Sequence, residues 1–259
     1  MTELEVAVKA AKEGGSILLK HFKTEIRSEQ KNPRDIVTQA DLESEQKIIS
    51  IIKESFPAHS ILAEESGLEE KAKDDLWVID PLDGTSNFFK GQRDFCVLIS
   101  YVHAGEITVG VTYFPLTDEL FVAEKGKGAT KNGEPIHVSR ETDVQKMYAV
   151  TQMTSNLKNR ISNLALYGKL LLKIRNIHVF NACIARGLAD VAEGIADFHF
   201  RRGFNYWDFA AGTLLVAEAG GTATDFSGMP VTRDTEDTLI SNGQAHDQLL
   251  KLVEQSVQE

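Results

Sequence analysis

The feature that most constrains this chain is a single segment, residues 77–88, which reads WVIDPLDGTSNF. A hydrophobic strand runs directly into Asp80, and Asp83 follows three positions later. Pro81 lies between the two carboxylates and restricts the backbone there. A turn is the simplest interpretation, because Asp, Gly and Pro are common turn residues. The order of the surrounding residues favours another interpretation, in which the two carboxylates serve a binding site.

The residues that follow predict an anion site beside these carboxylates. Gly84 lets the backbone come close to a ligand, and Thr85 and Ser86 add hydroxyl groups. If a helical turn starts here, its free N–H groups would bind an anion. Carboxylates next to an anion site make sense with Mg²⁺ between them, because this hard cation takes oxygen ligands and shares the phosphate.

Three more acidic residues are candidates for the same site. Glu64 follows an apolar strand predicted over 60–63, although a solvated acidic loop is the default interpretation of such a residue. Asp208 begins a predicted helix, where an N-cap aspartate contributes about 1 kcal/mol of stability and can also ligate a metal. Asp41 either caps a helix in the same way or acts as a base that orients a threonine and a water.

Composition narrows the classes of protein to consider. The 259 residues carry a formal net charge of −10, so no basic face for nucleic acid is expected. The seven histidines lack HxxxH and HExxH spacing, which disfavours zinc, whereas a site of oxygen ligands favours Mg²⁺ or Mn²⁺. Cys96 and Cys183 are interpreted as buried thiols rather than as a disulfide or a metal site. Without a signal-peptide pattern or an apolar run near the ~20 residues that span a bilayer, we expect a soluble cytoplasmic protein with no membrane contact.

Hydrophobic periodicity and turn residues predict a chain of alternating helices and strands. A helix is predicted over 4–22, although Gly14 and Gly15 weaken its middle, and a polar loop over 28–34. Further helices are predicted from about 41, over 156–172, 182–193 and 208–219 (closed by Gly220-Gly221), and from about 246; strands are predicted over 60–63, 76–80, 95–102, 107–113, 119–123, 147–151, 174–179, 195–200, 222–225 and 238–241. This order is typical of an α+β or layered α/β architecture.

Four ordered motifs resemble the inositol monophosphatase family of lithium-sensitive, metal-dependent phosphatases, and the resemblance covers almost the whole chain. The motifs are DIVT…D at 35–41, EES at 64–66, the segment at 77–88, and the stretch from Trp207-Asp208 to Gly220-Gly221. The resemblance implies an α+β fold, a layered αβαβα sandwich, and a homodimer. We place the division between an N-terminal half with most metal ligands, 1–142, and a C-terminal half, 143–259, that contributes Asp208.

The same resemblance implies a ligand set for two or three Mg²⁺ ions. The first ion would be held by Glu64, Asp80 and the Leu82 carbonyl oxygen, and the second by Asp80, Asp83 and Asp208. A more weakly held third ion would lie near Glu64, and its replacement by Li⁺ would inhibit the enzyme. Mn²⁺ would also suit such ligands.

Roles in phosphate ester hydrolysis follow from the same resemblance. The backbone at Gly84 and Thr85 would bind phosphate, with Ser86 nearby. Asp41 would pair with Thr85 to position or activate the attacking water, and Glu64 would complete the catalytic residues. Hydrolysis needs in-line attack by water and neutralisation of the phosphoryl charge, which metal ions supply, so no covalent phosphoenzyme is required.

Substrate specificity is left open among several classes. Residues 83–88 resemble the branch of inositol phosphatases and archaeal-type sugar bisphosphatases, which predicts inositol 1-phosphate or a related polyol or sugar phosphate. The alternatives on the same scaffold are fructose 1,6-bisphosphate, histidinol phosphate and nucleotide 3′-phosphates. A different class is a partner-binding regulatory protein, because some relatives in this family bind transcription machinery.

Two departures from the family pattern fall on substrate-contacting positions. Animal inositol enzymes have a glutamate that contacts inositol hydroxyls seven positions before Asp208, where this chain has Arg201. Either Arg201 grips a second phosphate or a carboxylate, or it is a solvent-facing charge at a strand end. The family's Gly-Ser/Thr-Ala-Ala stretch also differs and reads Ala182-Cys183-Ile184-Ala185 here.

Overall fold

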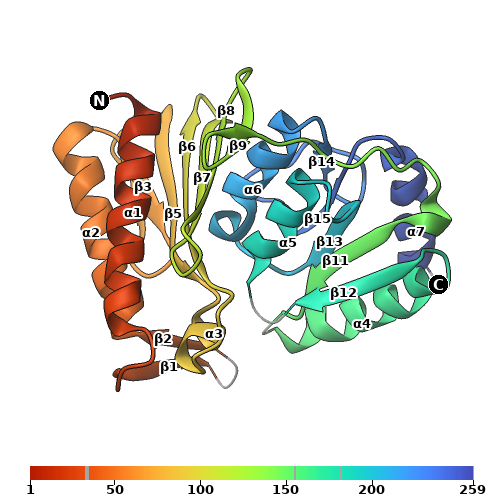
Figure 1. The fold of residues 1–259 in the computed structure, drawn as a ribbon, viewed down its shortest axis with the longest axis horizontal. Helices are drawn as coiled ribbons and strands as arrows, with labels where there is room; N and C mark the ends of the chain where they lie inside the picture. Colours follow the sequence, from red (N-terminus) through yellow and green to blue (C-terminus); the bar gives the residue numbers. More distant parts are fainter. Residues whose placement is uncertain (33–34, 155, 181–182, 259) are drawn as a thin grey trace.

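Five alternating layers of helices and sheets make up the computed structural model, which describes residues 1–32, 35–154, 156–180 and 183–258 (Figure 1). The helical layers are, in order, α1 (Glu3–His21) with α2 (Gln39–Ser55), then α5 (Ile184–Ala192) with α6 (Tyr206–Glu218), and finally α4 (Leu157–Leu171) with α7 (His246–Gln258). An eight-stranded sheet and a five-stranded sheet lie between these layers. The predicted αβαβα sandwich is therefore confirmed.

The first sheet has the strand order β10-β9-β8-β7-β6-β5-β3-β4. Its strands are β3 (Ser60–Ala63), β4 (Gly67–Glu69), β5 (Asp75–Asp83), β6 (Cys96–His103), β7 (Glu106–Phe114), β8 (Glu119–Glu124), β9 (Gly128–Lys131) and β10 (Glu134–Pro135). Among these pairings only β3 and β5 run parallel, and their register places Ala63 opposite Ile79. Because parallel strands end at the same edge, Glu64 emerges beside Asp80.

The second sheet has the order β12-β11-β13-β15-β14. Its strands are β11 (Tyr148–Gln152), β12 (Asn176–Phe180), β13 (Phe198–Arg202), β14 (Thr222–Thr224) and β15 (Asp237–Ser241). Strand β13 runs parallel to β11 and antiparallel to β15, with Arg201 opposite Thr238. After β13, a short loop leads into α6, so that Arg201 and Asp208 come from adjacent segments.

The predicted polar loop over 28–34 is wrong. Its first residues form β1 (Ser28–Asn32), which pairs with β2 (Asp35–Thr38) in an antiparallel ribbon. Strand β1 reads SEQKN and has no apolar residue. The alternation of apolar and polar positions that signals a strand is therefore missing from the sequence.

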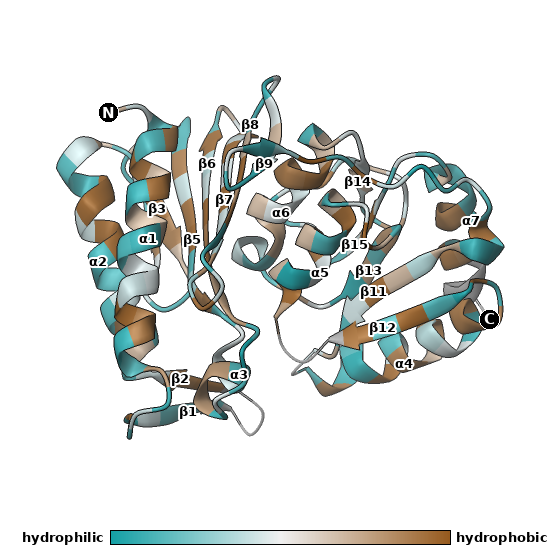
Figure 2. Ribbon diagram, in the orientation of Figure 1, coloured by the Kyte–Doolittle hydropathy of each residue, from teal (hydrophilic) through white to brown (hydrophobic). Residues whose placement is uncertain are grey.

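The two sheets share one hydrophobic core. Leu188 and Leu215, from the central helices, belong to the same buried cluster as Val78 of the first sheet and Ile240 of the second. Figure 2 shows the matching concentration of hydrophobic residues along β5 and β7. The division predicted between residues 142 and 143 falls between β10 and the short 3₁₀ helix Val144–Lys146, and it stays a prediction. Among the described residues, no helix is long and apolar enough to cross a membrane.

Glycines in α1 permit close packing rather than weakening the helix. The helix runs unbroken through Gly14 and Gly15, and both are buried. A Cβ atom at Gly15 would lie 2.7 Å from Cε1 of Tyr113, and one at Gly14 would lie 2.9 Å from Cδ1 of Ile48. The propensity cost of two glycines, about 1 kcal/mol each, is offset by the approach of α1 to α2 and β7.

We expect Gly15→Ala to lower the free energy of unfolding by about 1–3 kcal/mol, because the added methyl group overpacks the contact with Tyr113. The matched control is Gly168→Ala in α4, where a Cβ would meet no heavy atom within 4 Å. That control should raise stability by about 0.5–1 kcal/mol. Urea denaturation measures both changes. Equal effects of the two substitutions would contradict the packing role of Gly15.

Candidate active site

A bulge at the end of β5 turns two carboxylates toward one place. Asp80 pairs with Leu98 of β6 and Asp83 with Cys96, so three steps on β5 stand opposite two steps on β6. Side chains alternate along a regular strand, which would send residues three apart to opposite faces. The extra residue in the bulge restores the same side. The strand predicted to stop at Asp80 thus continues through Pro81 to Asp83.

Glu64 and Asp80 lie at adjacent strand ends. The Glu64 N–H donates to the Ile79 carbonyl at 3.1 Å, which extends the β3–β5 alignment by one residue. The Leu82 N–H donates to Oδ1 of Asp80 at 2.9 Å and fixes that carboxylate, which is only 2% exposed. The structure therefore brings Glu64, Asp80 and the Leu82 backbone together, as predicted.

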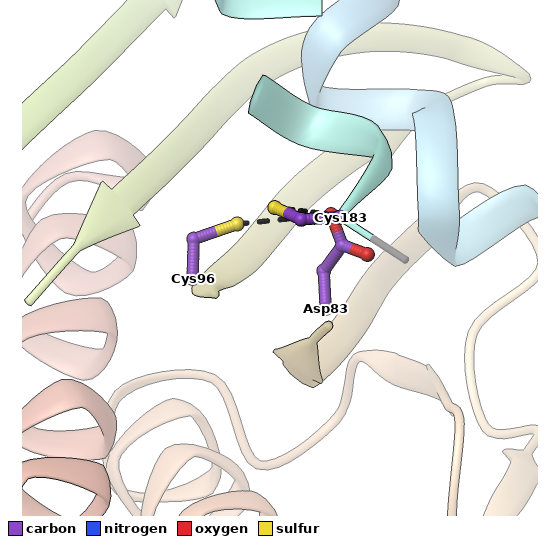
Figure 3. A group of neighbouring side chains, drawn as sticks. All are labelled: Asp83, Cys96 and Cys183. Atoms are coloured by element: carbon purple, nitrogen blue, oxygen red, sulfur yellow. Dashed lines mark hydrogen bonds between the residues drawn. The ribbon is translucent and has the colours of Figure 1, made fainter. Parts of the chain in front are cut away.

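The N-terminus of α5 holds Asp83 (Figure 3). The N–H of Ile184 donates to Oδ1 at 3.2 Å and that of Ala185 to Oδ2 at 2.8 Å. The thiol of Cys183 donates to Oδ2 at 3.3 Å, and that of Cys96 approaches the same oxygen at 3.9 Å. Both cysteines are buried and free, as predicted. Asp83 thus ties the first sheet to the central helical layer.

The interpretation of Asp208 as the N-cap of its helix is wrong, because α6 begins at Tyr206 and Asn205 is its N-cap. Asp208 is the third residue of α6, and its Oδ2 accepts the Asn205 N–H at 2.7 Å in a capping box. Its carboxylate also lies within electrostatic range of the site. Desolvation raises the pKa of Asp208 to about 7, the positive charge of Arg201 opposes this shift, and the charges of Glu64 and Asp83 add to it.

Four carboxylates therefore converge and repel one another. Burial raises the pKa of Asp80 well above its usual range, and the negative charges of Glu64, Asp83 and Asp208 raise it further. Burial also raises the pKa of Asp83 to about 6, against the pull of its backbone donors. Within the described part of the chain, no basic side chain forms an ion pair with Asp80, Asp83 or Asp208. A set of oxygen donors with excess negative charge fits a hard divalent cation.

Asp41 and Thr85 meet beside this cluster, as predicted. The Thr85 hydroxyl lies 3.0 Å from Oδ1 of Asp41 and 3.0 Å from the Leu82 carbonyl oxygen. Asp41 is fully buried, and its Oδ2 accepts both the N–H and the hydroxyl of Thr38, at 2.8 and 2.5 Å. Burial raises the pKa of Asp41 to about 6. The pair is fixed by α2 on one side and by the end of β5 on the other.

A short helix, α3 (Thr85–Phe89), follows Gly84. Gly84 has φ +95°, and a Cβ there would lie 2.8 Å from the Asp94 carbonyl oxygen, so only glycine fits without strain. Thr85 is half-buried and Ser86 is exposed at the start of α3. Of the predicted substrate-contacting stretch, Cys183 and Ile184 lie against Asp83, and Ala182 lies outside the described residues.

Lys31 is a site residue that the sequence analysis missed. Its Nζ lies 2.8 Å from Oε1 of Glu64 and 2.5 Å from Oε1 of Glu65. It reaches them from β1, the strand that was predicted as a loop. Because β1 has no hydrophobic signature, no sequence signal pointed to the contact. Lys31 therefore pairs with Glu64 and Glu65, whereas within the described residues no basic side chain pairs with Asp80.

A model of the inositol monophosphatase family matches residues 2–258. The chain belongs to the inositol monophosphatase family. It is 35% identical over 260 residues to a fructose-1,6-bisphosphatase/inositol-1-monophosphatase of Thermotoga maritima, covering 100% of this chain and 98% of that protein. It is 39% identical over 229 residues to the Nus factor SuhB of Escherichia coli, covering 87% of this chain and 85% of that protein.

Solved structures of family members agree with this assignment. The extragenic suppressor protein SuhB of Bartonella henselae superposes with a TM-score of 0.90 at 31% identity, covering 96% of this chain and 97% of that one. An IMPase/NADP phosphatase complexed with Mg²⁺ and phosphate superposes with a TM-score of 0.80 at 25% identity, covering 93% and 90%. Family membership and this complex together indicate a divalent-metal dependence.

Asp80→Asn should raise the melting temperature of the protein in EDTA, because it removes a buried charge that three like charges surround. The free energy of unfolding should rise by about 1–3 kcal/mol. Mg²⁺ should stabilise the wild type and have little effect on the variant. Asp190→Asn is the matched control, since Asp190 is also buried, with a pKa raised to about 6, but lies away from the cluster. It should keep the full response to Mg²⁺.

The pH dependence of this stability has a defined sign. The folded-state pKa values of Asp41 and Asp83, about 6, and of Asp208, about 7, lie above the ordinary value of 3.8. The metal-free folded state therefore holds protons more tightly than the unfolded chain. Its stability should fall as pH rises from about 4 to 7. A melting temperature in EDTA that rises over this range would contradict the repulsion.

Proposed function

We propose that this protein is a Mg²⁺-dependent phosphatase that hydrolyses small phosphate monoesters, with inositol 1-phosphate or a related polyol or sugar phosphate as substrate. The observation that carries the proposal is the convergence of Glu64, Asp80, Asp83 and Asp208 beside the hydrogen-bonded Asp41–Thr85 pair. The names of its relatives support the same reaction class.

The donor set suits two or three Mg²⁺ ions, and Mn²⁺ would suit it as well. Glu64, Asp80 and the Leu82 carbonyl oxygen would hold one ion, and Asp80, Asp83 and Asp208 another. Asp80 belongs to both proposed ligand groups, and the charges of Glu64, Asp83 and Asp208 all act on it. When bound, Mg²⁺ would neutralise phosphoryl charge and acidify water. The contacts of Asp83 with α5 keep its carboxylate in a fixed orientation.

Thr85 and Asp41 would position the attacking water. With the Thr85 hydroxyl proton directed at Asp41, the Thr85 oxygen is free to accept a hydrogen bond from a water molecule. A lone pair of that water would then be available for attack on the phosphorus atom. Asp41, with its raised pKa, would be the buried base that fixes the direction of the threonine proton. Glu64, at the end of β3, would complete the catalytic residues.

Backbone N–H groups would receive the phosphate. The first N–H groups of a helix have no partner within it, and in α3 these include the N–H groups of Thr85 and Ser86. Gly84 brings this backbone within reach, because the absence of a Cβ allows its positive φ. The exposed Ser86 hydroxyl would add a donor at the same place.

The test is release of phosphate from inositol 1-phosphate and fructose 1,6-bisphosphate, with Mg²⁺ and with EDTA. The wild type should turn over only with Mg²⁺. Asp83→Asn should lower kcat at least about 100-fold, because one carboxylate oxygen and its orientation are lost. Asp190→Asn, the control described above, should stay within about threefold of the wild type. Activity in EDTA, or an active Asp83→Asn variant, would overturn the metal assignment.

A partner-binding role is the second candidate, and the likeness to Nus factor SuhB of Escherichia coli favours it. The two functions separate in one variant. Binding to transcription machinery should survive Asp83→Asn in a pull-down, whereas hydrolysis should not. The other chemical alternatives, histidinol phosphate and nucleotide 3′-phosphates, are distinguished by including them in the same substrate panel.

We also propose a homodimer that uses the outer face of α4. This helix exposes an apolar stripe at the spacing of one helical face: Leu157 at 51%, Ile161 at 64% and Leu164 at 49%. Leu172, just beyond the helix, is 84% exposed and extends the stripe. Such a stripe on an outer layer is typical of a surface that another subunit covers.

Ile161→Lys should convert the dimer to a monomer, because a charge at the centre of the stripe would be desolvated on association. Light scattering after size exclusion measures the mass. Leu19→Lys is the matched control, since Leu19 is 42% exposed on α1, in the layer at the opposite end of the sandwich. A dimeric Ile161→Lys variant would place the interface elsewhere.

A further inference from the structure

Arg201 is a buried cation that has no counter-ion among the residues that the structure describes. It is only 7% exposed, and within the same residues its Nε has no hydrogen-bond partner. Among the described residues, no carboxylate lies within 4.0 Å of its guanidinium. Arginine is almost never fully buried unless it is paired, because desolvating an isolated charge is costly. The solvent-facing interpretation of Arg201 is therefore wrong. A cation buried in this way would be stabilised by a bound anion.

The charge of Arg201 acts on the candidate active site. Burial lowers the pKa of its guanidinium, and the negative charges of Asp208 and Asp83 oppose that shift. The guanidinium lies over the ring of Phe204, 5.9 Å from its centroid, which supports the side chain from the loop that leads to Asp208. Arg201 is thus within electrostatic range of both carboxylates, although among the described residues it forms no ion pair with either.

The neighbouring arginine shows what an ordinary pairing looks like in this strand. The Nε of Arg202 lies 3.5 Å from Oδ2 of Asp237, and its side chain is 27% exposed. Its guanidinium packs over Phe226, 5.2 Å from the ring centroid. Adjacent residues of a strand point to opposite faces. Among the described residues the Nε of each arginine lacks a hydrogen-bond partner, but only Arg202 has a carboxylate within ion-pair distance.

Metal binding, as proposed above, would remove the negative charge that still balances the Arg201 guanidinium. If Asp83 and Asp208 are committed to Mg²⁺, their negative charge is neutralised and no longer balances the guanidinium. The missing anion must then come from the ligand. A guanidinium offers donors in a fork that matches a phosphate or a carboxylate, whereas a neutral polyol presents no charge to it.

We infer that Arg201 forms an anion subsite beside the metal-binding carboxylates and selects phosphate monoesters that carry a second anionic group, such as a sugar bisphosphate, over esters of neutral polyols. This inference rests on the proposed phosphatase function and narrows its substrate class. The scissile phosphate would occupy the metal and α3 end of the site, and the second phosphate or carboxylate would lie against Arg201.

The test compares kcat/KM for two doubly anionic esters, fructose 1,6-bisphosphate and 3-phosphoglycerate, with that for two singly phosphorylated polyols, inositol 1-phosphate and glycerol 2-phosphate. Arg201→Gln should lower kcat/KM for the doubly anionic esters about 10–100-fold, mainly through KM, because it removes a charged hydrogen-bond donor. The polyol phosphates should change less than about threefold. Arg201→Lys should recover part of the loss. Arg202→Gln should leave kcat/KM unchanged for all four substrates. Comparison of fructose 1,6-bisphosphate with 3-phosphoglycerate shows whether the second anionic group is preferred as a phosphate or as a carboxylate.

Equal losses for all four substrates would overturn the inference, since Arg201 would then act only by balancing charge within the site. A wild type that prefers the polyol phosphates would overturn it as well. If no ester is hydrolysed with Mg²⁺, the proposed function fails. In that case the uncleaved bisphosphate serves as a probe, and calorimetric binding to the wild type and to Arg201→Gln decides the subsite. Weaker binding by the variant alone supports it, and equal binding excludes it.

Discussion

Repulsion among carboxylates at the ends of β3 and β5 is the constraint on which the rest of this site depends. Asp80 is 2% exposed and faces the negative charges of Glu64, Asp83 and Asp208. Three elements hold this arrangement in place: the bulge in β5, the N-terminus of α5 and the first turn of α6. Keeping these like charges together destabilises the metal-free folded state. A bound hard cation would neutralise the carboxylates and so offset their repulsion.

The charged residues of the site come from both halves of the chain. Asp83 belongs to the first sheet, but its oxygens accept hydrogen bonds from Ile184 and Ala185 of the central helical layer. Asp208 and Arg201 come from the second half of the chain. A ligand at the site would therefore contact both halves at once. The Asp41–Thr85 pair, by contrast, is fixed within the first half and depends on α2 and on the end of β5.

Sequence alone predicted the parts of this site that depend on local chemistry. Residues 77–88 indicated that a strand leads into the site, although β5 ends at Asp83 rather than at the predicted Asp80. The family resemblance joined Asp41 to Thr85, which the structure brings to 3.0 Å. Three features could not be predicted. The β5 bulge depends on the register with β6, the strand that carries Lys31 has no apolar residue, and the contacts of Cys96 and Cys183 with Asp83 join distant segments. Burial of Arg201 likewise depends on how β13 packs, and local sequence carries no record of it.

A crystal structure of the protein grown with Mn²⁺, with anomalous difference maps, tests the central claim most directly. We expect Mn²⁺ on both sides of Asp80, one ion coordinated with Glu64 and the Leu82 carbonyl oxygen and another with Asp83 and Asp208, at metal–oxygen distances of about 2.0–2.2 Å. Such a map would show that the converging carboxylates are a metal site. Anomalous density only elsewhere, with the four carboxylates uncoordinated, would contradict the account.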